Sequence, residues 1–296
     1  MSRTSLSLPH LLLALAIMAV WGTNFVVIRF GLNHLPPLLF AALRFTIAFL
    51  PAALFIRRPR VPLVRLASYG LLIGAGQFGL LFIAMKSDLS PGLASLILQS
   101  QAFFTVGLAI LLSGERLRPH QWAAVAMAAA GMALIGYLGG GDATPLGLAL
   151  GLVAALCWAG GNVVARSTPG VNMLAYVVWS SMFAAPPLFL LSFLFEGPAA
   201  MTAGLASADA ATWAAVVWQS VGNSMFGYAA FGWLLSRYPA ASVAPMSLLV
   251  PVFGMGASAL LLGESLPLWK FAAAALVIGG LVVNQFWPAG RRITPA

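Results

Sequence analysis

The stretch Gly114-Glu115-Arg116-Leu117 recurs 149 positions later as Gly263-Glu264-Ser265-Leu266. A long run of apolar and small residues precedes each copy, and an aromatic residue followed by an alanine-rich run comes after each. Self-similarity at a fixed spacing is the mark of an internal duplication. The sequence therefore predicts two halves, each of which ends in the same pair of hydrophobic segments.

A second pair of matching stretches supports the duplication. Trp21-x4-Val26-Val27-x-Arg29 returns 137 positions later as Trp158-x4-Val163-Val164-x-Arg166. The two spacings differ by 12 residues (149 minus 137), which a longer connection over 196–210 accounts for. We expect three parts of the chain, namely a first half over 1–138, a second half over 146–287 and a cytoplasmic tail over 288–296.

The composition indicates a membrane environment. Of the 296 residues, 61% are apolar and 7% are charged, whereas ordinary soluble domains have roughly half and a quarter. Ten apolar runs approach the roughly 20 residues that a helix needs to cross a bilayer. These runs are 10–28, 37–56, 66–85, 91–112, 121–138, 146–165, 173–195, 211–235, 240–262 and 268–287. The sequence predicts an all-α integral membrane protein of ten transmembrane helices, with the lipid bilayer as its surroundings.

Basic residues sort by loop, and this pattern orients the helices. With the N-terminus in the cytoplasm, eleven of the 15 lysines and arginines fall on the cytoplasmic side, and only Arg29, Lys86 and Lys270 fall on the other. Cytoplasmic loops of membrane proteins carry such an excess of positive charge. We therefore expect both termini in the cytoplasm. The net charge of +9 does not indicate nucleic-acid binding, because the basic residues form no patch on a soluble surface.

An odd number of helices in each half has a consequence for the symmetry of the molecule. Five helices in each half place the two halves upside down relative to each other, so Glu115 and Glu264 lie on opposite sides of the membrane. Inverted repeats are a common architecture of secondary transporters, in which the substrate path follows the interface between the repeats. The sequence thus predicts two inverted five-helix repeats and a transport function.

The order of these motifs resembles the EamA family of the drug/metabolite transporter superfamily. The resemblance rests on Trp21-Gly22-Thr23-Asn24, on the Gly-Glu endings of the fourth and ninth helices and on the duplication, and it covers essentially the whole chain. Within the family, the chain looks most like the YddG-type bacterial exporters of aromatic and other amino acids. The resemblance implies an inner-membrane carrier that exports amino acids by alternating access. Helices 1, 3, 4, 6, 8 and 9 would surround a central cavity, with helices 5 and 10 at the periphery.

Uncharged polar residues within the apolar runs are the candidates for a substrate cavity. Amides both donate and accept, so a few of them can bind an ammonium and a carboxylate without a permanent buried charge. Helical spacing groups them with aromatic residues. The predicted cavity residues are Trp21, Asn24, Gln99, Phe103, Trp158, Asn162 and Asn223. The alternative is that such amides join helices in lipid, as we expect for Gln77, which shares a face with Gly70 and Gly74.

Prolines indicate where two of the helices bend. Pro91 and Gly92 open the fourth helix, and Pro245 and Pro251 interrupt the ninth. Each proline of the ninth helix frees a backbone carbonyl one turn before it. A freed carbonyl in a membrane needs a partner or a water-filled cavity. We predict that these four residues form hinges that gate the path, and the alternative is a simple kink satisfied by neighbouring helices.

Three charged residues are assigned structural roles. Glu115 and Glu264 lie at helix C-termini, where a carboxylate opposes the helix dipole. We therefore expect each to cap a neighbouring helix or to pair with an arginine. Arg44 lies inside the second apolar run, where a charge is expensive. We expect Arg44 to be a structural anchor, with substrate contact as the alternative.

Several kinds of chemistry are missing from the sequence. No Asp, Glu, Lys or His lies near the middle of a predicted span, so the titratable chain of a proton pump is lacking and a facilitator is favoured. The single cysteine, Cys157, excludes an internal disulfide and a cysteine metal cluster, and we expect no metal and no cofactor. An integral-membrane lipid-modifying enzyme needs a cluster of nucleophile, acid or metal ligand, which is not found. A carrier for another small metabolite or drug, and either a monomer or a homo-oligomer, are left open.

Overall fold

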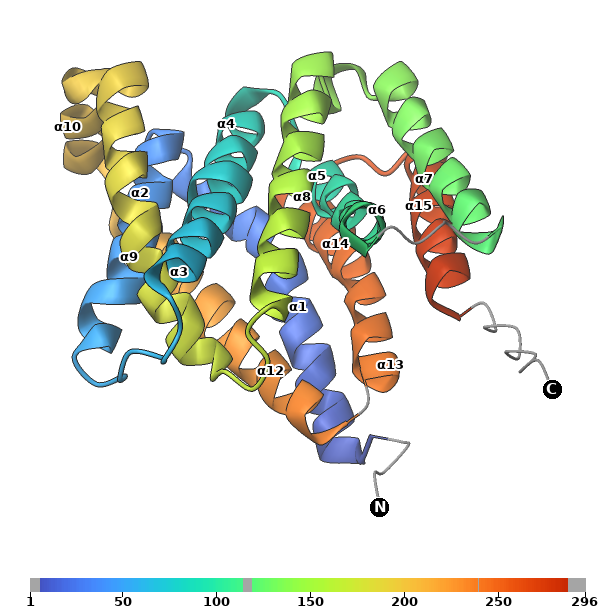
Figure 1. Cartoon of the computed structure of the whole chain (residues 1–296). Helices are drawn as coiled ribbons and strands as arrows, with labels where there is room; N and C mark the ends of the chain where they lie inside the picture. Colours follow the sequence, from blue (N-terminus) through green and yellow to red (C-terminus); the bar gives the residue numbers. More distant parts are fainter. Residues whose placement is uncertain (1–5, 114–118, 239, 287–296) are drawn as a thin grey trace.

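The computed structural model describes residues 6–113, 119–238 and 240–286, and these ranges are almost entirely helical (Figure 1). The elements are α1 (Leu8–Gly31), α2 (Pro37–Ala53), α3 (Leu63–Gly70), η1 (Leu71–Gly79), α4 (Leu80–Ser87), α5 (Pro91–Ile97), η2 (Leu98–Ser100), α6 (Gln101–Ser113), α7 (Pro119–Leu138), η3 (Gly140–Asp142), α8 (Pro145–Arg166), α9 (Met173–Leu191), η4 (Ser192–Glu196), α10 (Gly197–Ser207), α11 (Ala210–Val217), η5 (Trp218–Phe226), α12 (Gly227–Arg237), α13 (Ala240–Val243), η6 (Ala244–Leu249), α14 (Val250–Leu262) and α15 (Leu268–Phe286). Within the described ranges, extended backbone pairs only at a bridge between Leu89 and Ala143.

Eight helical stretches of the described residues are long and apolar enough to cross a membrane. They are Leu8–Gly31, Leu63–Ser87, Pro91–Leu112, Pro119–Leu138, Pro145–Arg166, Met173–Ser207, Pro245–Leu262 and Leu268–Phe286. Two of the ten predicted spans are not in this set. The helix α2 has only 17 residues, and the stretch from α11 to α12 holds buried polar residues, among them Gln219 and Asn223, that lower its mean hydropathy. The fold is that of a helical integral membrane protein.

Prolines and polar caps fix where several helices begin. Pro37, Pro91 and Pro145 are the first residues of α2, α5 and α8, the position at which the missing N–H of proline costs nothing. The Thr144 side chain accepts a hydrogen bond from the Gly147 backbone N–H at 3.0 Å, which caps α8. The long helices therefore start where the sequence places their first proline.

Loops that the charge pattern assigns to one side of the membrane contact one another. The Ser90 N–H donates to the Asp142 carbonyl at 2.7 Å, and the Glu196 carboxylate accepts from the N-terminus of α2. These loops follow helices 1, 3, 5 and 7 of the predicted order. Two loops that the charge pattern assigns to the opposite side also meet, because Arg65 donates to the carbonyl of Ser167. Consecutive long helices thus alternate in direction through the bundle.

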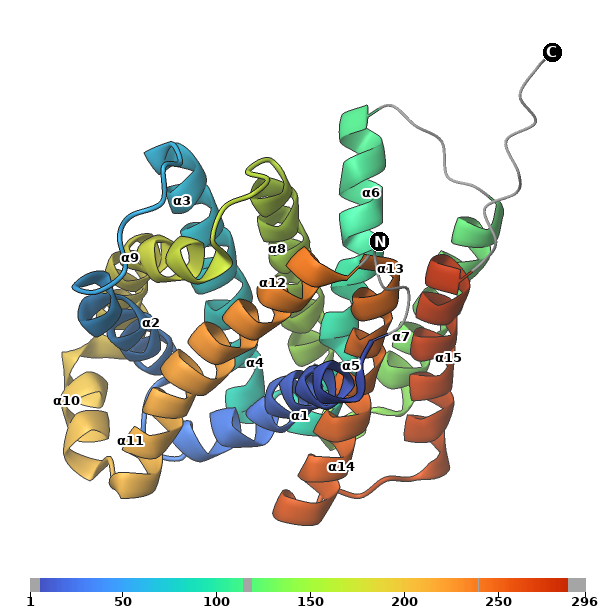
Figure 2. The same cartoon turned by 90° about the horizontal axis from the view of Figure 1, so that it is seen from below.

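Close helix pairs form the two edges of the molecule. The helices α7 and α15 pack along each other at one edge, and α2 and α9 pack at the opposite edge (Figure 1, Figure 2). Between the edges, α1 packs on α14 and α6 packs on α8. Glycines allow this approach: a Cβ on Gly22 would lie 2.4 Å from the Cβ of Phe253, and a Cβ on Gly280 would lie 2.7 Å from the Ala124 carbonyl. Small residues at such contacts are typical of membrane helices.

Five helical stretches contain an irregular segment, one of which is the short π-segment η4 after α9. The segments η1 and η5 are π-helical and contain nine residues each, whereas η2 and η6 are 3-10 turns. A π-turn bonds residue i to i+5 and a 3-10 turn bonds i to i+3, so both rotate the following side chains relative to a regular helix. Three of these segments, η1, η2 and η5, border a cavity.

Candidate functional site

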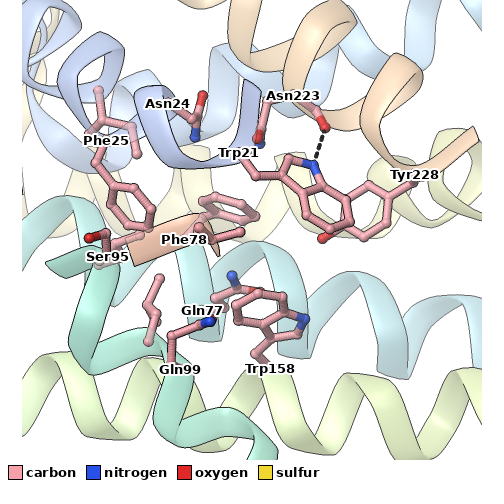
Figure 3. A pocket seen from close by; sticks show the side chains of 14 residues that line it. Trp21, Asn24, Phe25, Gln77, Phe78, Ser95, Gln99, Trp158, Asn223 and Tyr228 are labelled. Carbon is pink, nitrogen blue, oxygen red and sulfur yellow. Dashed lines mark hydrogen bonds between the residues drawn. The ribbon is translucent and has the colours of Figure 1, made fainter. Parts of the chain in front are cut away.

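A cavity opens between helices of both halves of the chain (Figure 3). Its empty space is about 490 Å³, the opening included. Polar groups come from Asn24, Gln77, Ser95, Gln99 and Asn223, and aromatic walls come from Trp21, Phe25, Phe78, Trp158 and Tyr228. Among the described residues, no charged side chain lines it. Its chemistry is therefore that of neutral donors and acceptors set among aromatic rings.

Five of the seven residues predicted for the cavity line it, namely Trp21, Asn24, Gln99, Trp158 and Asn223. Figure 3 shows Gln77, Gln99 and Trp158 across the cavity from Trp21, Asn223 and Tyr228. The two tryptophans that the duplication matches thus stand on different walls. Trp158 comes from α8, which packs against η1, and Trp21 comes from α1, which packs against η5.

Trp21 is held in place by the π-segment of the eighth predicted span. Its indole N–H donates to the backbone carbonyl of Asn223 at 3.2 Å, and its ring lies 5.6 Å from that of Tyr228 between centroids. Gly227 makes room for the indole, because a Cβ there would lie 2.3 Å from its nitrogen. Among the described residues the side-chain amide of Asn223 has no hydrogen-bond partner, and it lines the cavity.

Asn24 joins α1 to the same π-segment. Gln219 Nε2 donates to Asn24 Oδ1 at 2.8 Å, and Asn24 Nδ2 lies 3.5 Å from Gln219 Oε1. Both side chains are buried. Asn24 therefore lines the cavity and also connects two helices, so the two roles considered for such amides coincide in one residue.

Gln99 links the fourth and ninth helices, for which the prolines predict hinges. Its Nε2 donates to the carbonyl of Ser247 at 2.9 Å. That carbonyl lies four residues before Pro251, and it is one of the two that proline frees from the helical pattern. Pro245 lies at the start of η6, and Pro251 is buried in the first turn of α14. The two prolines therefore flank the 3-10 turn of the ninth helix.

Gln77 lines the cavity, although the sequence suggested packing for it. Gly70 and Gly74 do pack tightly on α9, where a Cβ on Gly70 would lie 2.2 Å from the Ser180 carbonyl. The π-segment η1 holds Gln77, and its wider turn rotates Gln77 away from the glycine face. Gln77 is 2% exposed, and its Oε1 has no hydrogen-bond partner. The sequence feature that could have indicated a cavity role for Gln77 is a polar amide inside a glycine-rich apolar run.

Phe103 and Asn162 lie outside this cavity. Asn162 Nδ2 donates to Gln101 Oε1 at 2.8 Å, which joins α8 to α6. Asn162 follows Trp158 by four residues, whereas Asn24 follows Trp21 by three, and one residue turns a helix by about 100°. The ring of Phe103 lies against Gly280 of α15. The two halves therefore differ at this position, and Asn162 faces α6 while Asn24 faces the cavity.

Arg44 is fully buried between α2 and the π-segment η5. Its Nη2 donates to Ser224 Oγ at 2.6 Å and to the Gln219 carbonyl at 3.2 Å. The guanidinium carbon lies 3.8 Å from the ring centroid of Phe78, a cation–π contact. These contacts fit the anchor that the sequence suggested, although Nε and Nη1 have no hydrogen-bond partner.

Glu264 connects three loops at one end of the bundle. Its carboxylate accepts hydrogen bonds from the hydroxyl of Ser90 at 2.6 Å and from the N–H of Gly92 at 3.0 Å, which caps α5. Lys270 Nζ lies 2.8 Å from the same carboxylate and 2.9 Å from Asp142 Oδ2. Burial alone would raise the pKa of Glu264, and its hydrogen bonds, with that from Lys270 the strongest, bring the pKa below the usual value.

The remaining sequence predictions concern the ends of the fourth helix. Pro91 begins α5, and Gly92 leaves space for the carboxylate, since a Cβ there would lie 2.9 Å from Glu264 Oε1. Glu115 lies outside the described residues, as do the other residues of 114–118 and the predicted tail over 288–296.

Comparisons with known proteins identify the family. The model of the EamA-like transporter family matches twice, over residues 8–137 and 145–285. A relative named a probable amino-acid metabolite efflux pump, from Salmonella typhimurium, is 42% identical over 93% of this chain and 94% of its own length. The Escherichia coli protein of the same name gives the same identity and shares.

Two more distant similarities cover most of the chain. A probable terminal-alkyne amino-acid exporter of Streptantibioticus cattleyicolor is 29% identical over 92% of each chain. A solved crystal structure with 23% identity superimposes with a TM-score of 0.63 over 94% of this chain and 96% of the other, which shows the fold alone. With its paired match over both halves, the chain belongs to the EamA-like transporter family.

Proposed function

We propose that the protein exports amino acids, aromatic and other neutral ones, through the cavity between its two halves. The observation that carries this proposal is the lining of neutral amides and aromatic rings around Gln77, Asn223 and Trp158. The relatives at 42% identity, which are named amino-acid metabolite efflux pumps, support the same substrate class. A small zwitterion with an apolar side chain matches such a lining.

The cavity offers both kinds of partner that an amino acid needs. The buried Gln77 Oε1 is an acceptor without a partner and is suited to an ammonium group. The Asn223 amide both donates and accepts, so it can bind a polar group of the substrate. Trp21 and Trp158 provide rings that can pack against an apolar side chain. The neutral groups of this cavity form no ion pair with the substrate, which suits a substrate that must leave again.

Ten membrane-crossing helices in two inverted repeats are the architecture that we infer. Irregular turns support it: π-segments of nine residues occur in the third and eighth helices, and 3-10 turns occur in the fourth and ninth. The packing supports it too. If the two halves are exchanged, helix 1 corresponds to helix 6 and helix 9 corresponds to helix 4. Helices 1 and 9 pack together, and so do helices 6 and 4. The two matches of the family model agree with repeats over 1–138 and 146–287.

We assign the protein to the bacterial inner membrane with both termini in the cytoplasm, on the basis of the loop charges. Single cysteines at positions 58 and 237 on a Cys157→Ser background should then resist an impermeant reagent applied to intact cells, whereas cysteines at 142 and 209 should react. Reaction at position 237 from outside would refute the orientation.

A transport screen tests the proposed function. Purified protein in sealed liposomes should accumulate at least one labelled amino acid of the twenty by exchange for unlabelled internal substrate, and the labelled compound should be recovered unchanged. Leaky liposomes of the same composition should retain none. Exchange of another small metabolite, with none of the twenty amino acids, would instead assign the carrier a different substrate, and chemical conversion in leaky liposomes would indicate an enzyme.

A further inference from the structure

A second cavity adjoins the first and differs from it in chemistry. The two share Phe78 and Tyr228 as lining residues. Hydroxyl groups dominate the polar lining of the second cavity, and they belong to Tyr69, Ser180, Ser181, Ser224 and Tyr228. The first cavity offers mainly amides. Ser181 and Ser224 donate to the carbonyls of Val177 and Gln219. The hydroxyls of Ser180 and of the two tyrosines can turn as donors toward one bound group, so this arrangement suits an acceptor such as a carboxylate.

Arg44 supplies a positive charge directly behind this lining. Ser224 lines the cavity and accepts from Arg44 Nη2 at 2.6 Å. The rings of Phe45 and Phe78, which also line the cavity, lie 4.7 Å and 3.8 Å from the guanidinium carbon. Three lining residues therefore contact the guanidinium.

This charge lacks a counter-charge among the described residues. Arg44 forms no ion pair there. The described carboxylates bind other partners: Asp88 binds Thr144, Asp142 and Glu264 bind Lys270, Glu196 binds the start of α2, and Asp209 binds Thr212. The Nε and Nη1 atoms of Arg44 are buried without a hydrogen-bond partner. A fully buried guanidinium in this state is costly unless an anion approaches it.

Ser180 adds a second, independent indication. Its side chain is 1% exposed, it lines the second cavity, and its hydroxyl has no hydrogen-bond partner. By contrast, the neighbouring Ser181 hydroxyl is bound to the Val177 carbonyl at 2.8 Å. A buried hydroxyl without a partner costs free energy unless a ligand or water satisfies it.

We propose that the second cavity binds the carboxylate of the exported amino acid. Ser180 and the tyrosine hydroxyls donate to the carboxylate oxygens, and Arg44 provides the positive charge from behind Ser224 and Phe78. The substrate side chain then lies in the first cavity, between Trp21 and Trp158, because Phe78 and Tyr228 border both spaces. This inference rests on the proposed function and adds that the protein recognises the carboxylate of its substrate.

A purely structural role of Arg44 is the rival explanation, and Ser180 separates the two. Arg44→Gln removes bonds that join α2 to η5 and can reduce the folded yield. Ser180→Ala removes a hydroxyl that bonds nothing in the protein, so the fold should be retained. Ser100→Ala is the matched control, because Ser100 is also a buried serine with an unpartnered hydroxyl and lines neither cavity.

The experiment measures which chemical group each variant recognises. In liposomes, the exchange of the labelled amino acid that the screen finds best is measured with increasing concentrations of three inhibitors. These are the unlabelled amino acid, its amide and its decarboxylated amine. Wild type should bind the amide and the amine at least tenfold more weakly than the amino acid. Ser180→Ala should weaken the amino acid about tenfold, the order expected for the loss of one hydrogen bond to a charged group. It should leave the amide and the amine unchanged.

Several outcomes would overturn the proposal. One is that Ser180→Ala weakens the binding of all three compounds equally. Another is that Ser100→Ala causes the same loss. A third is that wild type binds the amino acid and the amine with equal affinity. Folded Arg44→Gln protein, checked by size-exclusion chromatography, should no longer distinguish the amino acid from its amine, and Arg44→Lys should restore part of the distinction. A wild type that exchanges none of the twenty amino acids defeats the proposed function itself, which is a separate result.

Discussion

Gln99 donates its side-chain N–H to the carbonyl of Ser247 at 2.9 Å, and this bond joins the fourth long helix to the ninth. Pro251 has no backbone N–H and so cannot donate to this carbonyl. Gln99 lies in a 3-10 turn that lines the cavity. The irregular turns of both helices are thus connected at one point beside the cavity. Any bending of one helix at its prolines would act on the other through this bond.

Replacement of Gln99 tests whether the connection serves transport. Gln99→Leu should lower the exchange rate per folded molecule at least tenfold while the folded yield falls little. Gln101→Leu is the control. Gln101 bonds to Asn162 between α6 and α8, away from the cavity. Its loss should lower the free energy of unfolding by about 1–3 kcal/mol, and the folded yield with it. The exchange rate per folded molecule should stay near wild type. The reverse pattern would contradict the assignment.

The amide pair of Asn24 and Gln219 should show strong coupling in stability. Each single change to leucine leaves one buried amide without its partner, which costs about 1–3 kcal/mol. The double variant removes both amides, so its loss should be smaller than the sum of the single losses. Thermal unfolding in detergent measures this. Additive losses would mean that the reciprocal contact contributes little.

The pKa of Glu264 predicts a pH dependence of stability. Because the pKa in the folded protein is lower than the ordinary value of 4.5, the carboxylate contributes stability that is fully present above that value. This contribution is lost as the pH falls from 4.5 through the lower pKa of the folded state. Thermal midpoints of wild type should therefore fall in this acid range. Glu264→Gln should be less stable at pH 7 and should flatten this decline, and identical slopes would contradict the prediction.

Energy coupling gives a further prediction, which we derive from the position of the carboxylates. Asp142 and Glu264 lie in loops at one end of the bundle and are held by Lys270. The described cavity lining has no group that titrates near neutral pH. The protein should therefore exchange amino acid in liposomes without an imposed pH or voltage gradient. Exchange that needs a proton gradient and disappears in Glu264→Gln would show proton coupling instead.

Much of the fold could be predicted from the sequence because hydropathy and small residues govern helix packing in membranes. The alanine-rich runs that close on Gly131 and Gly280 pack together, with Gly131 against α15 and Gly280 against α7. The helix boundaries follow prolines such as Pro91 and Pro145. The stretch around Gln219 could be placed as a helix, but the polar residues of its π-segment keep its mean hydropathy below that of a standard span.

The site could be predicted only in part because helix irregularities decide which face a side chain shows. Trp21 and Trp158 were found through the duplication. Gln77 was missed, since regular helical spacing placed it with Gly70, and a π-turn changes that register. The unpartnered hydroxyl of Ser180 and the missing counter-charge of Arg44 depend on contacts between distant helices, for which local sequence holds no signal.

The central claim is that the substrate occupies the cavity between Trp21 and Trp158, and protection from labelling tests it most directly. Gln77→Cys and Asn223→Cys, each on a Cys157→Ser background, would be treated with a thiol reagent in liposomes with and without the transported amino acid. Asp209→Cys, which lies in an exposed loop, is the control. We predict that the amino acid slows labelling at positions 77 and 223 in proportion to its occupancy and leaves position 209 unaffected. Equal labelling rates at 77 and 223 with and without substrate, in variants that still transport, would contradict the account.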